Sequence, residues 1–253
     1  PLPREANPAL GCRGIRLLLA HPEILHTQLR AILRLSATHP VSLLLPMMRG
    51  VDELRATKAA IERVKLELSA AGMSFNPAIP LGAMIETPSA AILVAQLADE
   101  VDFFSIGTND LVQYLLAADR INGEADSAYE PLHPAILQTL AMLAKTARSK
   151  DKPISLCGEI ASDPVYTALL IGLGFRCFSV SPGRLLEIKH AIRSTYLNAA
   201  SEFASGVLSL NCVPDIRAQV QANWNQRRPV SSPDLSSTTS PSITSPVVMS
   251  ITS

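Results

Sequence analysis

The sequence predicts an α/β fold organised around a parallel sheet. Short apolar runs alternate with longer segments of helical periodicity, which is the pattern of strand–helix–strand units. Hydrophobic residues make up 47% and charged residues 17% of the 253 residues, so a sizeable core can form. The sequence has no GxGxxG loop, which argues against a dinucleotide-binding domain.

Five apolar runs are candidates for buried strands. They occupy Val41–Met47, Gly82–Glu86, Asp102–Gly107, Ile154–Gly158 and Cys177–Val180. Their shortness, with longer helical patterns between them, favours strands of a parallel sheet.

Two of the intervening segments carry clear helix signals. One helix face is predicted by the spacing of Leu54, Ile61, Val64 and Leu68. Gly72 is a natural stop for that helix. Pro88 stands where a first helical turn begins, and Thr87 before it is a candidate N-cap.

Composition and charge exclude several classes of function. Lys+Arg and Asp+Glu are balanced at 22 each, which gives no support for nucleic-acid binding or for a basic membrane surface. No run of apolar residues is long enough to predict a membrane span, and the first ten residues do not resemble a signal peptide. The cysteines are widely spaced, which predicts reduced thiols in a cytoplasmic protein and no zinc site: Cys12, Cys157, Cys177 and Cys212.

Polar residues follow three of the predicted strands. Glu86 closes one strand, Asn109 and Asp110 follow the next, and Cys157 closes another. In parallel α/β folds, ligands bind beyond the carboxyl ends of the strands. Glu86 and Asp110 are 24 residues apart, about one strand–helix–strand period, so two carboxylates at adjacent strand ends could share Mg²⁺.

Each of these residues also has an ordinary structural interpretation. Glu86 could cap the following helix, and Asp110 could be a helix-start residue. Cys157 could be a small buried apolar side chain, and Arg13 and Arg120 could be solvated surface charges. Periodicity alone therefore predicts an α/β domain with a possible cation site.

Four segments resemble the signature segments of the phosphoenolpyruvate-utilising enzymes. They are Asn7–Arg16 (NPALGCRGIR), Gly82–Ala90 (GAMIETPSA), Asp102–Arg120 (DFFSIGTNDLVQYLLAADR) and Cys157–Asp163 (CGEIASD). Within that family the sequences of these segments are most similar to those of enzyme I of the bacterial sugar phosphotransferase system, including the enzyme I-like parts of multiphosphoryl transfer proteins. The resemblance runs from about Arg4 to about Arg193, and four motifs in the same order make it specific.

The resemblance implies a TIM (β/α)8 barrel, of which this sequence supplies roughly strands four to eight. Its expected activity is phosphoryl transfer from phosphoenolpyruvate to a protein histidine, with release of pyruvate. The expected partners are a phosphohistidine domain and a phosphocarrier protein, and barrels of this family form homodimers. The strands that precede Asn7 in the family are missing, so we expect a truncated barrel that is poorly soluble or partly unfolded by itself and catalytically inert.

The resemblance also assigns roles to individual residues. Glu86 and Asp110 match the Mg²⁺ ligands, and Cys157 matches the general acid that protonates the enolate of pyruvate. The residues that match substrate contacts are Arg13, Asn109, Asp110 and Arg120. None of the five histidines lies in the family's phosphohistidine motif, so we nominate none.

We expect three regions along the chain. Residues 1–197 form the incomplete barrel, 198–224 a helical extension, and 225–253 a disordered tail, because 17 of the 25 residues from Pro229 to Ser253 are Ser, Thr or Pro. Two alternative functions stay open: an inactive remnant, and a domain of the phosphoenolpyruvate synthase or pyruvate phosphate dikinase type.

Overall fold

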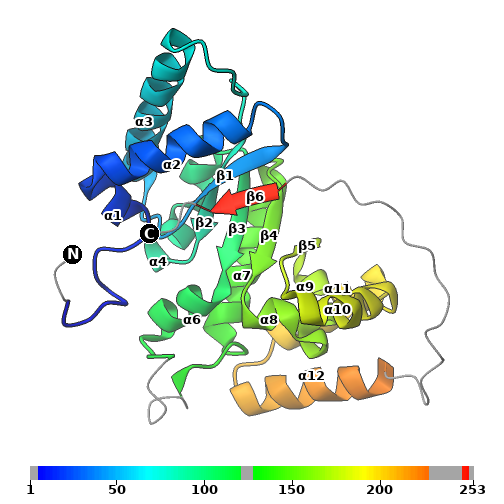
Figure 1. Cartoon of the computed structure of the whole chain (residues 1–253). Coiled ribbons are helices and arrows are strands. Elements are labelled where there is room, and N and C mark those ends of the chain that lie inside the picture. Colours follow the sequence, from blue (N-terminus) through cyan, green and yellow to red (C-terminus); the bar gives the residue numbers. More distant parts are fainter. Residues whose placement is uncertain (1–4, 121–127, 228–246, 251–253) are drawn as a thin grey trace.

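A parallel sheet runs through the molecule (Figure 1). The computed structural model describes residues 5–120, 128–227 and 247–250. The strands follow the order β5-β4-β3-β2-β1-β6, and every neighbouring pair is parallel. Their bounds are β1 Val41–Leu45, β2 Leu81–Ile85, β3 Phe103–Gly107, β4 Ile154–Cys157, β5 Cys177–Phe178 and β6 Val247–Ser250.

The predicted α/β fold is confirmed, and each of the five predicted strands is found within two residues of its expected bounds. β1 to β5 lie side by side in chain order, with helices between successive strands, as in part of a (β/α)8 barrel. All five residues of β1 are buried, as expected for a strand covered on both faces.

Helices connect the strands and cover the sheet. α1 and α2 precede β1, α3 follows it, and α10 to α12 lie beyond β5 (Figure 1). Their bounds are α1 Ile15–Ala20, α2 Pro22–Leu35, α3 Val51–Ala70, α4 Pro88–Ile92, α5 Val94–Ala98, α6 Thr108–Leu116, α7 Pro134–Ser149, α8 Glu159–Ser162, α9 Thr167–Leu173, α10 Leu185–Arg193, α11 Leu197–Leu208 and α12 Val213–Arg227. None of the helices in the described ranges is long and apolar enough to cross a membrane.

The predicted helix signals are confirmed. The predicted face of α3 is buried where the helix packs on α1 and α2, with Leu54 and Leu68 fully inaccessible. Gly72 follows α3 with φ +65°, a conformation that side chains other than glycine rarely adopt. The Thr87 hydroxyl accepts a hydrogen bond from the Ala90 N–H over 3.2 Å, and Pro88 occupies the first turn of α4.

The C-terminal helices pack on the same core as the sheet. A Cβ at Gly172 of α9 would lie 2.0 Å from the Ala200 carbonyl oxygen of α11, so these two helices touch through their backbones. Val207 of α11 and Ile216 of α12 are fully buried in the main hydrophobic cluster. The segment expected to be a helical extension is therefore packed against α9 and shares the hydrophobic cluster that contains the strand residues.

Most of the tail expected to be disordered, 225–253, lies outside the described residues. The described residues depart from that expectation in two places. Residues 225–227 complete the last turn of α12, and Val247–Ser250 form β6 alongside β1. The four residues VVMS favour an extended conformation, and β1 would otherwise present an unpaired edge.

Candidate functional site

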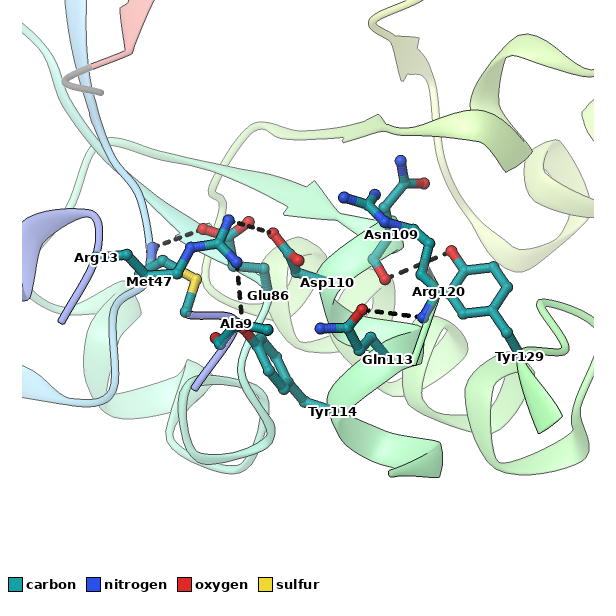
Figure 2. Close-up of polar contacts among 10 residues, drawn as sticks. All are labelled: Ala9, Arg13, Met47, Glu86, Asn109, Asp110, Gln113, Tyr114, Arg120 and Tyr129. Carbon is teal, nitrogen blue, oxygen red and sulfur yellow. Dashed lines mark hydrogen bonds and ion pairs between the residues drawn. The ribbon is translucent and has the colours of Figure 1, made fainter. Parts of the chain in front are cut away.

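The candidate residues gather at the carboxyl ends of β2, β3 and β4. Glu86 directly follows β2, Asn109 and Asp110 lie in the first turn of α6 after β3, and Cys157 ends β4. Gly107 and Cys157 are register partners of neighbouring strands, which brings their ends together. Figure 2 shows Glu86 and Asp110 converging, with Arg13 reaching them from the loop before α1.

Glu86 is a buried carboxyl group that is held by a backbone donor. Its side chain is only 5% exposed, and its Oε1 accepts a hydrogen bond from the Met47 N–H over 2.6 Å. Burial raises the pKa of Glu86 from 4.5 to about 7, the Met47 N–H opposes this, and the nearby Asp110 charge adds to it. Gly107 makes room for this carboxyl, because a Cβ there would lie 2.6 Å from Glu86 Oε2.

The helix-cap interpretation of Glu86 is wrong for this structure. Thr87 caps α4, while Glu86 turns back to the loop after β1. At this strand end, the Thr87 hydroxyl therefore accepts the hydrogen bond that caps α4, and the Glu86 carboxyl is left to face the candidate site.

Arg13 forms an ion pair with Asp110. Its Nη2 lies 3.3 Å from Asp110 Oδ2, and its Nη1 donates to the Tyr114 hydroxyl over 3.4 Å. The Tyr114 hydroxyl donates in turn to the Ala9 carbonyl oxygen, which ties the N-terminal loop to α6. Arg13 is thus a guanidinium positioned beside Asp110, and 38% of its side chain is exposed to solvent.

Cys157 is held by three hydrogen bonds to the β3–α6 segment. Its Sγ–H donates to the Ile106 carbonyl oxygen over 3.2 Å, and its sulfur accepts from the Ser105 hydroxyl over 3.8 Å. The Thr108 hydroxyl donates to the Cys157 carbonyl oxygen over 2.6 Å. Burial raises the pKa of the Cys157 thiol and the Ser105 hydrogen bond opposes this, so the group is a protonated thiol at neutral pH.

Asn109 and Arg120 lie on the same side of the site as Tyr129 (Figure 2). Asn109 Oδ1 accepts from the Glu159 N–H over 3.0 Å, and the Asn109 carbonyl oxygen accepts from the Tyr129 hydroxyl over 3.4 Å. The Arg120 N–H donates to Gln113 Oε1 over 3.3 Å, just after α6 ends. All the predicted site residues therefore lie along one edge of the sheet, with Arg13 and Arg120 on opposite sides of Asp110.

The carboxylate pair suits a hard cation. Burial of Glu86 beside Asp110 leaves two acidic oxygen donors close together, and these are the ligand type that Mg²⁺ prefers. Within the described part of the chain, no three His, Cys, Asp or Glu side chains form a group that could hold a metal. A cation here would complete its coordination with water or ligand oxygens, which is common for Mg²⁺.

Several residues that build the site were not among the predicted ones. Tyr114, Ser105, Tyr129 and the Met47 N–H each contact a predicted site residue across the fold. A signal existed for Ser105, which alternates with Gly107 on β3 and so faces the same side. No local pattern pointed to Tyr129, whose partner is 20 residues away.

Comparison with known proteins supports the resemblance. A family profile described as PEP-utilising enzyme, PEP-binding domain, matches residues 1–197. The chain is 43% identical over 202 residues to the phosphoenolpyruvate-protein phosphotransferase of Cupriavidus necator, covering 80% of this chain and 34% of that protein. The proteins of the same name from Bacillus subtilis and Haemophilus influenzae are 40% and 44% identical, covering 88% and 82% of this chain.

The chain spans only 39% and 36% of the lengths of the latter two relatives. Among solved structures, a citrate lyase from Burkholderia xenovorans matches with a TM-score of 0.49 at 19% identity, covering 81% of this chain and 70% of the other.

Proposed function

This chain belongs to the PEP-binding domain family of the PEP-utilising enzymes, and from that premise we propose that its site binds phosphoenolpyruvate within a phosphoenolpyruvate-protein phosphotransferase. The proposed reaction moves the phosphoryl group of phosphoenolpyruvate to a protein histidine and releases pyruvate. One observation carries the proposal: a buried acid, a carboxylate–arginine pair and a protonated thiol lie at adjacent strand ends.

The two arginines are proposed to hold the anionic substrate. A guanidinium donates parallel hydrogen bonds that suit carboxylate and phosphate groups. Arg13 is already oriented by Tyr114 and Asp110, so little side-chain freedom is lost when a ligand binds. Arg120 lies on the opposite side of Asp110 from Arg13, and Asn109 lies beside Arg120 (Figure 2).

The proposed chemistry begins with breakage of the bond between phosphorus and the enol oxygen. The phosphoryl group passes to a histidine nitrogen, and the electron pair of the broken bond stays on oxygen as the enolate of pyruvate. Arg13 and Arg120 stabilise the negative charge, and the buried surroundings strengthen these interactions. Glu86 and Asp110 are the residues that would hold Mg²⁺, which when bound supplies positive charge for the phosphate and enolate oxygens.

Cys157 is the proposed general acid. The enolate must gain a proton at its methylene carbon to become pyruvate, and the thiol can deliver it. The raised pKa of Cys157 keeps that proton on sulfur until the enolate forms. The Ser105 hydroxyl then donates to the resulting thiolate, because it already points at the sulfur.

The partners follow from the same proposal. We infer that a phosphohistidine domain delivers the accepting imidazole and that a phosphocarrier protein receives the phosphoryl group, as the resemblance implies. Free cysteines are typical of a reducing compartment, so we propose that the protein acts in the cytoplasm. The homodimer stays a prediction, which analytical ultracentrifugation of this chain tests.

Isothermal titration of the chain with phosphoenolpyruvate in the presence of Mg²⁺ tests the proposal. We expect saturable binding that EDTA weakens and that Arg13→Gln reduces at least about tenfold, as for a charged hydrogen bond. Arg184→Gln is the matched control, because Arg184 pairs with Glu187 on the exposed surface. A folded wild-type chain that binds no phosphoenolpyruvate, or an Arg13→Gln variant that binds as well as the control, would overturn it.

A further inference from the structure

Helix α12 contacts the loop before α7, and this loop also contacts the candidate site. The guanidinium of Arg217 pairs with the carboxylate of Glu130, and the same carboxylate accepts from the Leu132 N–H over 2.9 Å. The side chain of Glu130 is only 16% exposed, whereas that of Arg217 is 67% exposed. The pair therefore joins a mostly covered carboxylate in the loop before α7 to a helix that is remote in sequence.

The neighbour of Glu130 reaches the site directly. Tyr129 donates its hydroxyl to the Asn109 carbonyl oxygen over 3.4 Å, at the start of α6. Burial raises the pKa of Tyr129 to about 12, so the hydroxyl stays a donor at neutral pH. Asn109 is also fixed from the other side by the Glu159 N–H. Tyr129 thus supports the backbone of a residue that stands beside the phosphoenolpyruvate site.

The position of α12 does not depend on this ion pair. Ile216 and Val220 are 0% and 2% exposed and belong to the main hydrophobic cluster. At the far end of the helix, Arg227 Nη1 donates to the Thr195 hydroxyl over 3.1 Å. Loss of the Arg217 charge would therefore leave α12 packed in place and would remove only the ion pair between the helix and the loop.

We propose that Arg217 is a positioning residue: by pairing with Glu130 it holds Tyr129 against Asn109 and so couples α12 to the substrate site. The inference rests on the proposed function for its ligand, but its first step is a contact within the chain. Arg217 acts through two other residues and touches no reacting atom.

The test compares Arg217→Gln with Arg227→Gln in the full chain. Both remove one arginine charge from α12, but only the first faces the loop. Hydrogen exchange of the amides in 128–133 is measured without ligand, and phosphoenolpyruvate affinity with Mg²⁺ is measured by titration. For Arg217→Gln we expect loop exchange to rise and affinity to fall by about two- to five-fold, the range for a partly exposed ion pair.

Arg227→Gln should change neither readout, and both variants should melt within a few degrees of each other. Raising salt to about 1 M should bring the wild type close to Arg217→Gln, because the pair is screened. Unchanged hydrogen exchange of the loop in Arg217→Gln would show that the ion pair does not hold the loop. Faster exchange with unchanged phosphoenolpyruvate affinity would show that the loop is not coupled to the site. A wild type that binds no phosphoenolpyruvate overturns the proposed function, while the exchange data still decide the contact.

Discussion

Replacing Glu86 by glutamine should stabilise the protein without ligand while removing its proposed metal site. The neutral amide imitates the protonated acid in shape and can still accept from the Met47 N–H. The free energy of unfolding of the variant should therefore exceed that of the wild type at neutral and alkaline pH. The wild type is destabilised there because it must keep a buried charge beside Asp110.

The magnitude follows from the pKa of Glu86, which rises from 4.5 to about 7 on folding. Between these values the folded protein holds a proton that the unfolded chain has lost. Stability contributed by this group is fully present below about pH 4.5 and is lost as pH rises through about 7. Since each pH unit corresponds to about 1.4 kcal/mol, the advantage of Glu86→Gln should grow by about 2.5 kcal/mol between pH 5 and pH 8.

Urea denaturation of both proteins in EDTA at several pH values measures this difference. Glu187→Gln is the control, because it removes the same charge from an exposed side chain that pairs with Arg184. Its stability difference from the wild type should stay nearly flat over the same range. Parallel pH curves for Glu86→Gln and the wild type would refute the reasoning, since the buried acid would then titrate as it does in the unfolded chain.

Three further changes probe the site from other directions. Gly107→Ala should destabilise the protein by about 1–3 kcal/mol in urea denaturation, because the new Cβ would lie 2.6 Å from Glu86 Oε2, whereas Gly183→Ala meets nothing within 4 Å. Ser105→Ala should raise the pKa of Cys157 and slow its alkylation by iodoacetamide at mildly alkaline pH, with the urea-unfolded protein as the reference. Cys157→Ala in a complete protein should leave phosphoenolpyruvate affinity nearly intact and slow pyruvate formation by about 10²–10⁴-fold.

Each of these expectations has an outcome that contradicts it. Equal stability of Gly107→Ala and Gly183→Ala would mean that the Glu86 carboxyl does not need the space over Gly107. Alkylation of Cys157 at an unchanged rate in Ser105→Ala would mean that the Ser105 hydroxyl does not lower the pKa of the thiol. Unchanged pyruvate release by Cys157→Ala would require a different proton donor.

The fold was predictable because its signals are local. An apolar run such as Val41–Met47 is short and continuous, and the stripe along α3 has the period of a helix, so the residues alone indicate both elements. The strand-end rule then placed Glu86 and Asp110 near each other from their spacing alone. The proposed ligand, however, came from the resemblance of four motifs and not from spacing.

The supporting contacts were not predictable because they join residues far apart in the chain. Arg13 and Tyr114 are separated by 101 positions, and Cys157 and Ser105 by 52, so no periodic pattern in the sequence indicates that either pair is in contact. The pairing of Val247–Ser250 with β1 was missed for a related reason. Composition described the tail as a whole and could not single out four apolar-rich residues that meet an open strand edge.

The contact between α12 and the Glu130 loop separates the hold on a ligand from the groups that would do the chemistry. The family profile ends at residue 197, before α12 begins at Val213, and the similarity to the Bacillus subtilis relative spans 223 residues and so reaches into α12. Substitutions there leave the acids, arginines and thiol of the site untouched. Under the proposed coupling, a substitution at Arg217 therefore changes how tightly the site holds its ligand without altering any group assigned to the chemistry.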